Sequence, residues 1–229
     1  MVMLIGIGVS QLVVITGVLL LARPDGVFGQ DALGMLALVV LALGVQTACL
    51  IGSVYWFAIR RRGLSWADLG VRPIGKDWVI RAALIAFAAY ALVAVVNLAV
   101  QFILFDEVQA NPQLTVLAPA GFSWTSLIAL LVLAGTIVPF AEELFFRGFL
   151  YGWLRPRRGV VTATVISALC FSLLHGIYWL IPALILLGVV LAIVYQRSGS
   201  ILAAAVTHGT FNTITIILLY VALATGLMD

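Results

Sequence analysis

Long apolar runs, separated by short segments that carry most of the charge, are the feature that most constrains how this chain folds. A run of about 20 apolar residues can cross the hydrocarbon core of a bilayer as a helix. Backbone groups that cross lipid must be hydrogen-bonded within their own segment, which favours helices. The sequence therefore predicts an all-α, polytopic transmembrane helical bundle. The expected spans, about seven, lie near residues 2–22, 33–59, 78–105, 124–154, 160–176, 181–196 and 201–225.

The amino-acid composition agrees with a membrane protein and argues against other classes. Hydrophobic residues make up 64% of the 229 residues and charged residues only 9%, which leaves too little polar surface for a soluble globule. The net charge of +3 is small and gives no support for nucleic-acid binding. Cys49 and Cys170 lie in apolar runs without a C-x-x-C pattern, so we interpret both as buried apolar groups. We expect residues 1–229 to form a single integral membrane domain.

The distribution of lysine and arginine predicts the orientation. If the amino terminus is inside, ten of the twelve basic residues fall on cytoplasmic loops or span ends, while Arg23 lies outside and Arg147 within the membrane. The ten are Arg60, Arg61, Arg62, Arg72, Lys76, Arg81, Arg155, Arg157, Arg158 and Arg197. The start of the run 2–22 lacks the positive charge of a signal peptide, so we expect an uncleaved first helix. The expected location is the cell (plasma) membrane, with a cytoplasmic amino terminus.

The first cytoplasmic loop contains one segment with a local pattern of its own. Ser65–Gly70 has a serine at the position of a helix cap and a glycine at the position of a helix stop. Two interpretations are open, a short helix that lies in the membrane interface and a plain loop.

Three ionisable residues interrupt the fourth apolar run: Glu142, Glu143 and Arg147. Each charge deep in a bilayer costs roughly 2.5 to 3.5 kcal/mol on insertion scales, unless it is paired or hydrated. Glu143 and Arg147 are four residues apart and share a helix face, whereas Glu142 is rotated by about 100°. We therefore expect Arg147 to pair with Glu143 and Glu142 to point into a cavity as a general base. Pro139 should kink this helix and free the carbonyl of Gly135. A structural ion pair between helices is the alternative.

The two histidines of the chain and one asparagine lie at depths similar to that of Glu142. Counted at about 1.5 Å per residue from the cytoplasmic ends, Glu142 and Asn212 lie roughly 18 Å deep, His175 roughly 22 Å and His208 roughly 12 Å. His208 and Asn212 are four residues apart and project from one helix face, as do Phe171 and His175. Four polar groups from three helices are therefore expected in one layer.

Two chemistries fit these residues. In the first, a water polarised between Glu142 and His175 attacks a peptide carbonyl, while His208 and Asn212 donate hydrogen bonds to the oxyanion. In the second, Glu142, His175 and His208 hold a divalent metal such as Zn²⁺. The H-E-x-x-H pattern of soluble metalloproteases is absent, and the residues do not decide between the two.

The three motifs together resemble those of the CPBP family of intramembrane proteases, which includes CAAX prenyl endopeptidases and bacteriocin-processing or immunity proteins. The E-E-x-x-x-R motif corresponds to Glu142–Arg147, F-x-x-x-H to Phe171–His175 and H-x-x-x-N to His208–Asn212. The similarity covers about residues 124–215, which are expected to form the catalytic core. Some members of the family have eight spans, so eight are also possible here.

This resemblance implies an intramembrane endopeptidase, a glutamate- or metal-dependent hydrolase that cleaves a membrane-associated peptide or protein. The substrate would be a CAAX-type tail or a related bacterial substrate. By resemblance, Glu142 and His175 are the catalytic pair, and His208 and Asn212 bind the oxyanion. The supporting residues are Glu143, Arg147 and Phe171.

Two functions of other classes remain as alternatives. One is a membrane transporter or proton relay, which would be expected to show broken helices in paired repeats, whereas only the Pro139 kink is found. The other is a non-catalytic bacteriocin-immunity protein of the same fold. The sequence predicts no oligomeric state and no partner beyond the substrate and the bilayer.

Overall fold

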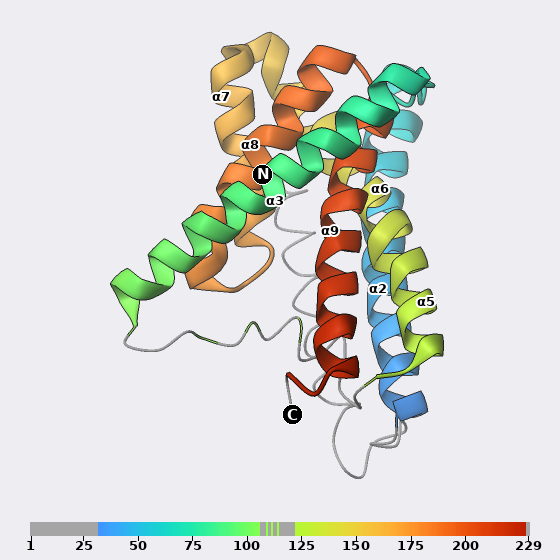
Figure 1. The fold of residues 1–229 in the computed structure, drawn as a ribbon. Helices are drawn as coiled ribbons and strands as arrows, with labels where there is room; N and C mark the ends of the chain where they lie inside the picture. Colours follow the sequence, from blue (N-terminus) through green and yellow to red (C-terminus); the bar gives the residue numbers. More distant parts are fainter. Residues whose placement is uncertain (1–31, 106–108, 110, 112–113, 115–121, 228–229) are drawn as a thin grey trace.

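The computed structural model describes residues 32–105, 109, 111, 114 and 122–227, and within this part the regular elements are helices without a strand (Figure 1). The predicted all-α fold is confirmed. The predicted first span, 2–22, lies outside the described residues. The elements in chain order are α2 (Ala32–Val54), η1 (Tyr55–Arg60), α3 (Lys76–Leu104), α5 (Trp124–Val132), η2 (Leu133–Ile137), α6 (Val138–Glu143), η3 (Leu144–Tyr151), α7 (Gly152–Leu173), η4 (Tyr178–Leu180), α8 (Ile181–Ser198) and α9 (Ile201–Ala224).

Five helices of the described part are long and apolar enough to cross a membrane, so the predicted number of seven is not confirmed. The predicted fourth and fifth spans fall within one helical stretch of 50 residues. Gly159 interrupts this stretch, with φ 82° and ψ 169°, and the chain reverses direction there (Figure 1). The five helices are Leu33–Arg60, Lys76–Leu104, Trp124–Leu173, Tyr178–Ser198 and Ile201–Ala224.

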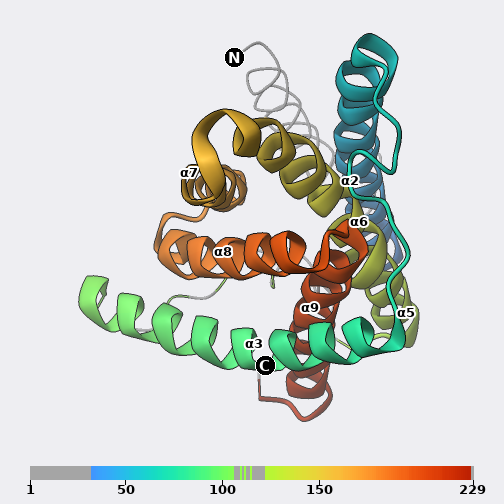
Figure 2. The ribbon, with the colours of Figure 1, turned by 90° about the horizontal axis from the view of Figure 1, so that it is seen from above.

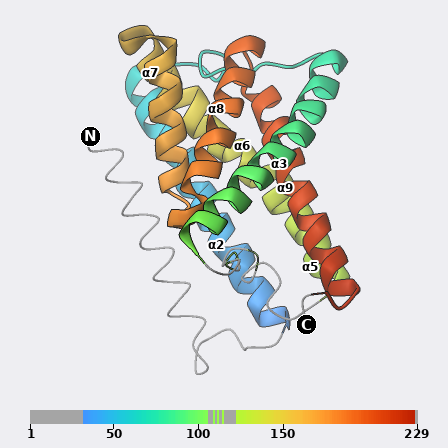
Figure 3. The ribbon, with the colours of Figure 1, turned by 60° about the vertical axis from the view of Figure 1, so that its left-hand side comes forward.

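α8 and α9 contact each other, and each packs against several other helices. Figure 2 shows α8 between α7 and α3, and α9 between α3 and α5, and each of these pairs is in contact. α3 runs obliquely across α8 and α9 (Figure 3). Many large apolar side chains of α3 are exposed, among them Leu84, Phe87 and Val95, as expected for a helix that faces lipid.

The element η3 is the innermost part of the bundle. All eight of its residues are buried, and it contacts α2, α6, α7, α8 and α9. Arg147 and Tyr151 of η3 are the largest fully buried side chains of the described residues. The first sequence motif therefore begins in α6 and continues into the centre of the protein.

The basic residues gather at one end of the bundle. Figure 1 shows at its upper end the end of η1, the start of α3, the reversal in α7 and the junction between α8 and α9. The ten basic residues predicted to be cytoplasmic lie in or beside these segments. Three of their guanidinium groups lie over tryptophan rings, in the pairs Arg61–Trp56, Arg81–Trp78 and Arg157–Trp153. Such cation–π pairs suit a membrane interface, where tryptophan is enriched.

The segment Ser65–Gly70 forms successive hydrogen-bonded turns and not the interfacial helix that was one of its two interpretations. The backbone N–H of Ser65 donates to Asp68 Oδ2 over 2.8 Å, and the N–H of Asp68 donates back to Ser65 Oγ over 3.2 Å. Gly70, at φ 84°, ends the turn in a left-handed conformation. Its carbonyl accepts from the N–H of Ile201 over 2.9 Å, which fixes the turn on the start of α9.

Candidate active site

The segment that leads to the two glutamates is not a regular α-helix. η2 follows the π-helical pattern, in which a backbone N–H donates to the carbonyl five residues earlier. Pro139 has no N–H, so in this register the carbonyl of Ala134 loses its helical donor. Asn212 of α9 replaces that donor, with Nδ2 2.9 Å from the oxygen of Ala134. The sequence predicted that the freed carbonyl would be that of Gly135, because that prediction assumed regular α-helical spacing.

Two glycines let α9 approach η2 closely. A β-carbon at Gly209 would overlap the backbone carbonyl of Gly135, and a β-carbon at Gly135 would lie 2.9 Å from Thr213 Oγ1. Small residues at a helix crossing allow the backbones to come together. The contact fixes α9 on η2, and so sets the positions of His208 and Asn212.

Glu143 and Arg147 form the ion pair that their spacing predicts. Arg147 Nη1 donates to Glu143 Oε1 over 2.8 Å, and both side chains are fully buried. Arg147 Nη2 donates to the backbone carbonyl of Gly188 in α8 over 2.9 Å. The guanidinium thus joins η3 to α8 and compensates the charge of Glu143.

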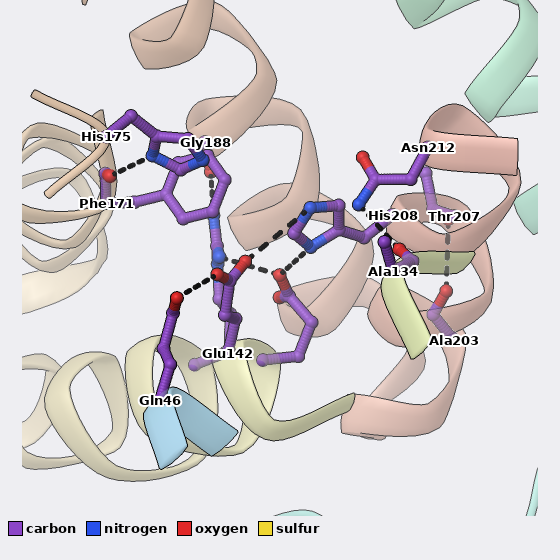
Figure 4. Close-up of polar contacts among 12 residues, drawn as sticks. Gln46, Ala134, Glu142, Phe171, His175, Gly188, Ala203, Thr207, His208 and Asn212 are labelled. Carbon is purple, nitrogen blue, oxygen red and sulfur yellow. Dashed lines mark hydrogen bonds and ion pairs between the residues drawn. The ribbon is translucent and has the colours of Figure 1, made fainter. Parts of the chain in front are cut away.

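Glu142 has different neighbours from Glu143. Its Oε1 accepts from Gln46 Nε2 of α2 over 3.2 Å, and its Oε2 lies 3.7 Å from His208 Nε2 (Figure 4). No arginine pairs with Glu142 among the described residues, and the residue is 7% exposed. Glu142 thus stays outside the Glu143–Arg147 ion pair, as predicted, and the cavity expected at Glu142 stays a prediction.

His208 lies between the two carboxylates. Its Nδ1 is 3.1 Å from Glu143 Oε1, and its Nε2 faces Glu142 Oε2 (Figure 4). A carboxylate only accepts, so a hydrogen bond at Nδ1 requires a proton on that nitrogen. The separation of 3.7 Å at Nε2 is too long for a hydrogen bond and leaves this nitrogen next to the carboxylate.

His175 lies just beyond the end of α7, in a turn and not inside a helix as the sequence suggested. Gly176 follows with φ 72°, which ends the helix. The Nδ1 of His175 is 2.8 Å from the carbonyl oxygen of Phe171. Since a carbonyl only accepts, Nδ1 carries the proton and Nε2 of the neutral ring is left as an acceptor.

Phe171 connects the two imidazoles. Its ring packs edge-to-face against His175 at 4.8 Å and against His208 at 5.5 Å between centroids. The guanidinium carbon of Arg147 lies 4.9 Å from the centre of the same ring. The supporting residue of the second motif thus touches groups from all three motifs.

The structure therefore brings Glu142, Glu143 and His208 into one cluster and places His175 beside it, across the ring of Phe171. It gives no direct hydrogen bond between His175 and Glu142 among the described residues. Asn212 shares a helix face with His208, but its amide donates to the carbonyl of Ala134.

A metal site formed by Glu142, His175 and His208 does not fit the observed arrangement. Within the described part of the chain, no three His, Cys, Asp or Glu side chains lie together as metal ligands. Glu142 and His208 are close enough to share an ion, but a protein zinc site takes three or four protein ligands. In addition, Oε1 of Glu142 already accepts a hydrogen bond from an amide.

Sequence reasoning missed Gln46, the neighbour of Glu142 from α2. The signal was one amide side chain in the apolar run 33–59, outside all three motifs. A glutamine in a membrane span often bonds across helices. Nothing in the sequence identified its partner, because 96 residues separate it from Glu142.

Comparisons with known proteins agree with the motifs. Residues 122–214 match the family described as type II CAAX prenyl endopeptidase Rce1-like. A segment of 79 residues, 34% of this chain, is 30% identical to the UPF0177 protein YxdF of Lactococcus lactis subsp. lactis (strain IL1403). That segment spans 43% of the length of this relative. No solved structure gives a significant match. The matched residues, 122–214, contain all three motifs.

Proposed function

We propose that this integral membrane protein is an endopeptidase in which Glu142 activates a water molecule for attack on a peptide carbonyl. The observation that carries the proposal is the unequal environment of two adjacent carboxylates. Glu143 is fully buried and held by Arg147 and His208, whereas Glu142 has a neutral amide as its hydrogen-bond donor. A carboxylate without a strong cationic partner is the better proton acceptor.

The proposed reaction uses the residues in the following way. Glu142 takes one proton from the water as the water oxygen bonds to the carbonyl carbon. The same proton then goes to the departing amide nitrogen as the peptide C–N bond breaks, which leaves a carboxylic acid and an amine. His175 Nε2, free to accept, orients the water.

The charge that develops on the carbonyl oxygen needs hydrogen-bond donors. His208 can donate from Nε2 when it is protonated, and Glu143 stabilises that charged ring through Nδ1. Asn212 uses one N–H for Ala134, and the amide has a second N–H for the oxyanion. These roles follow the resemblance and agree with the clustering of both side chains on α9.

The proposed substrate is a membrane-associated peptide or protein, with a CAAX-type prenylated tail as the first candidate because of the family match at residues 122–214. We propose that the basic end of the bundle is cytoplasmic, in the plasma membrane and with a cytoplasmic amino terminus. Arg61, Arg81 and Arg157 lie at this end over tryptophan rings, which supports this orientation.

A cleavage assay tests the proposal. The purified full chain in proteoliposomes is incubated with membrane-anchored peptides, each in a prenylated and an unprenylated form, and products are identified by mass spectrometry. We expect cleavage by the wild type and a cleavage rate lower by at least roughly a hundredfold in Glu142→Gln, because glutamine is nearly the same size as glutamate but cannot act as a general base. Equal product from both proteins would remove the catalytic assignment of Glu142.

A further inference from the structure

Gln46 lies in a part of the chain that the family match does not include. The match covers residues 122–214, and Gln46 is in α2. Leu50 and Val54 follow at four and eight residues, and both are buried in the main apolar core. Residues at this spacing share one face of a helix. The same packing that buries Leu50 and Val54 therefore turns Gln46 toward the interior.

The contact between Gln46 and Glu142 has a defined direction. Because a carboxylate only accepts, the group 3.2 Å from Glu142 Oε1 is the amide nitrogen of Gln46, which donates. The second oxygen, Oε2, lies 3.7 Å from His208 Nε2. Oε1 thus faces a side chain of α2, and Oε2 faces a side chain of α9 (Figure 4).

The chemistry of an amide suits an orienting group for a base. An arginine at this position would hold the carboxylate in a strong ion pair, as Arg147 does for Glu143. A glutamine donates one hydrogen bond to the carboxylate without adding a charge. The next residue, Thr47, is a useful comparison, because its buried Oγ1 has no hydrogen-bond partner among the described residues. A polar side chain at this level of α2 is therefore not hydrogen-bonded simply because it is buried.

We infer that Gln46 is a positioning residue that holds the carboxylate of Glu142 in the orientation required for water activation. This inference rests on the proposed function. It adds a fourth segment, outside the three motifs, to the catalytic arrangement.

Kinetics separate this role from a structural one. Gln46→Leu removes the donor and keeps the approximate size, so we expect kcat to fall roughly 10- to 100-fold, as for a misplaced reacting group, with KM within about twofold. Gln46→Glu places a second carboxylate, which only accepts hydrogen bonds, opposite the carboxylate of Glu142, and it should lower kcat at least as much. Thr47→Val, the matched control on the same turn of α2, should keep the wild-type kcat. Wild-type kcat in folded Gln46→Leu would overturn the inference.

A spectroscopic measurement tests the contact without an assay. The chain has three glutamates, Glu107, Glu142 and Glu143, so carboxyl-¹³C glutamate labelling gives a simple infrared difference spectrum. The carboxylate band that is lost in Glu142→Gln should change frequency in Gln46→Leu and stay unchanged in Thr47→Val.

The outcomes are distinguishable. If the wild type cleaves no peptide but the band moves, the proposed function fails while the contact stands. If the wild type cleaves and neither the band nor kcat responds to Gln46→Leu, the inference on Gln46 fails alone. If neither Gln46→Leu nor Gln46→Glu folds, Gln46 has a structural role and the inference is also overturned.

Discussion

Gly209 of α9 lies against the backbone carbonyl of Gly135 in η2, so closely that a β-carbon on Gly209 would overlap the carbonyl oxygen. His208 directly precedes Gly209, and its ring lies between the two glutamates. The distance between two backbones therefore sets the distance between the imidazole and the carboxylates.

Gly209→Ala should push α9 away from η2 and displace His208. Overpacking of this kind costs about 1–3 kcal/mol, and a backbone carbonyl cannot rotate away as a side chain can. We expect a lower unfolding temperature in detergent and a loss of cleavage of roughly tenfold or more. Gly52→Ala is the matched control, because an added β-carbon there has no atom within 4 Å. Equal unfolding temperatures for the two variants would contradict the proposed close packing.

Arg147→Leu should destabilise the protein strongly. The substitution leaves the buried Glu143 without its cation and the carbonyl of Gly188 without its donor. Removing one partner of a buried pair costs about 3–5 kcal/mol, which unfolding in a denaturant series can measure. The double variant Glu143→Leu with Arg147→Leu should recover part of this loss, because no uncompensated charge remains. A single variant as stable as the wild type would show that water reaches Glu143.

Arg147→Lys should fall between the wild type and Arg147→Leu in stability. Two different nitrogens of the guanidinium serve Glu143 and Gly188, and a lysine has only one nitrogen at the end of its side chain. Thermal unfolding of the three proteins under the same conditions gives the order. A lysine variant equal to the wild type would mean that charge alone matters at this position.

The turn at Ser65–Gly70 should depend on pH through Asp68. Hydrogen bonds from the side chain and backbone of Ser65 lower the pKa of Asp68 below its ordinary value of 3.8. A lowered pKa in the folded state means that the stabilisation is present above pH 3.8 and is lost as the pH falls through the lower folded value. In the wild type, the hydrogen-exchange protection of a peptide that covers residues 64–72 should therefore not change with pH near neutrality, after correction for intrinsic rates. At neutral pH the same peptide should exchange faster in Asp68→Ala than in the wild type. Equal protection in both proteins would contradict a role for Asp68 in the turn.

Helical periodicity predicted the local relations of the site correctly. The spacing of Glu143 and Arg147 predicted their ion pair, and the rotation of Glu142 by about 100° predicted its separate environment. The apolar runs predicted a helical fold because a bilayer leaves few other choices. These successes concern residues within one helix or a property of the whole chain.

The relations between helices could not be predicted in the same way. The pairing of Gln46 with Glu142 and of His208 with both glutamates depends on helix crossing and tilt, which counting residues from the span ends does not give. The freed carbonyl was assigned to Gly135 and is that of Ala134, because the π-helical register of η2 shifts the hydrogen bonds by one residue. Gly159 likewise reverses the chain inside a continuous helical stretch, so the span count depends on one backbone conformation.

Chelation should leave peptide cleavage unchanged. Glu142 Oε2 and His208 Nε2 face each other, but the neighbouring Glu143 contacts the other nitrogen of His208 and pairs with Arg147. No three His, Cys, Asp or Glu side chains within the described residues are arranged as metal ligands. His175, the third ligand of the metal hypothesis, holds the carbonyl of Phe171 through Nδ1 and lies beyond that ring. The measurement compares initial rates before and after treatment with EDTA and 1,10-phenanthroline, together with the metal content of the protein by mass spectrometry. Activity that disappears with the chelator and returns with added Zn²⁺ would contradict the glutamate mechanism, and it would require His175 to move toward Glu142 and His208.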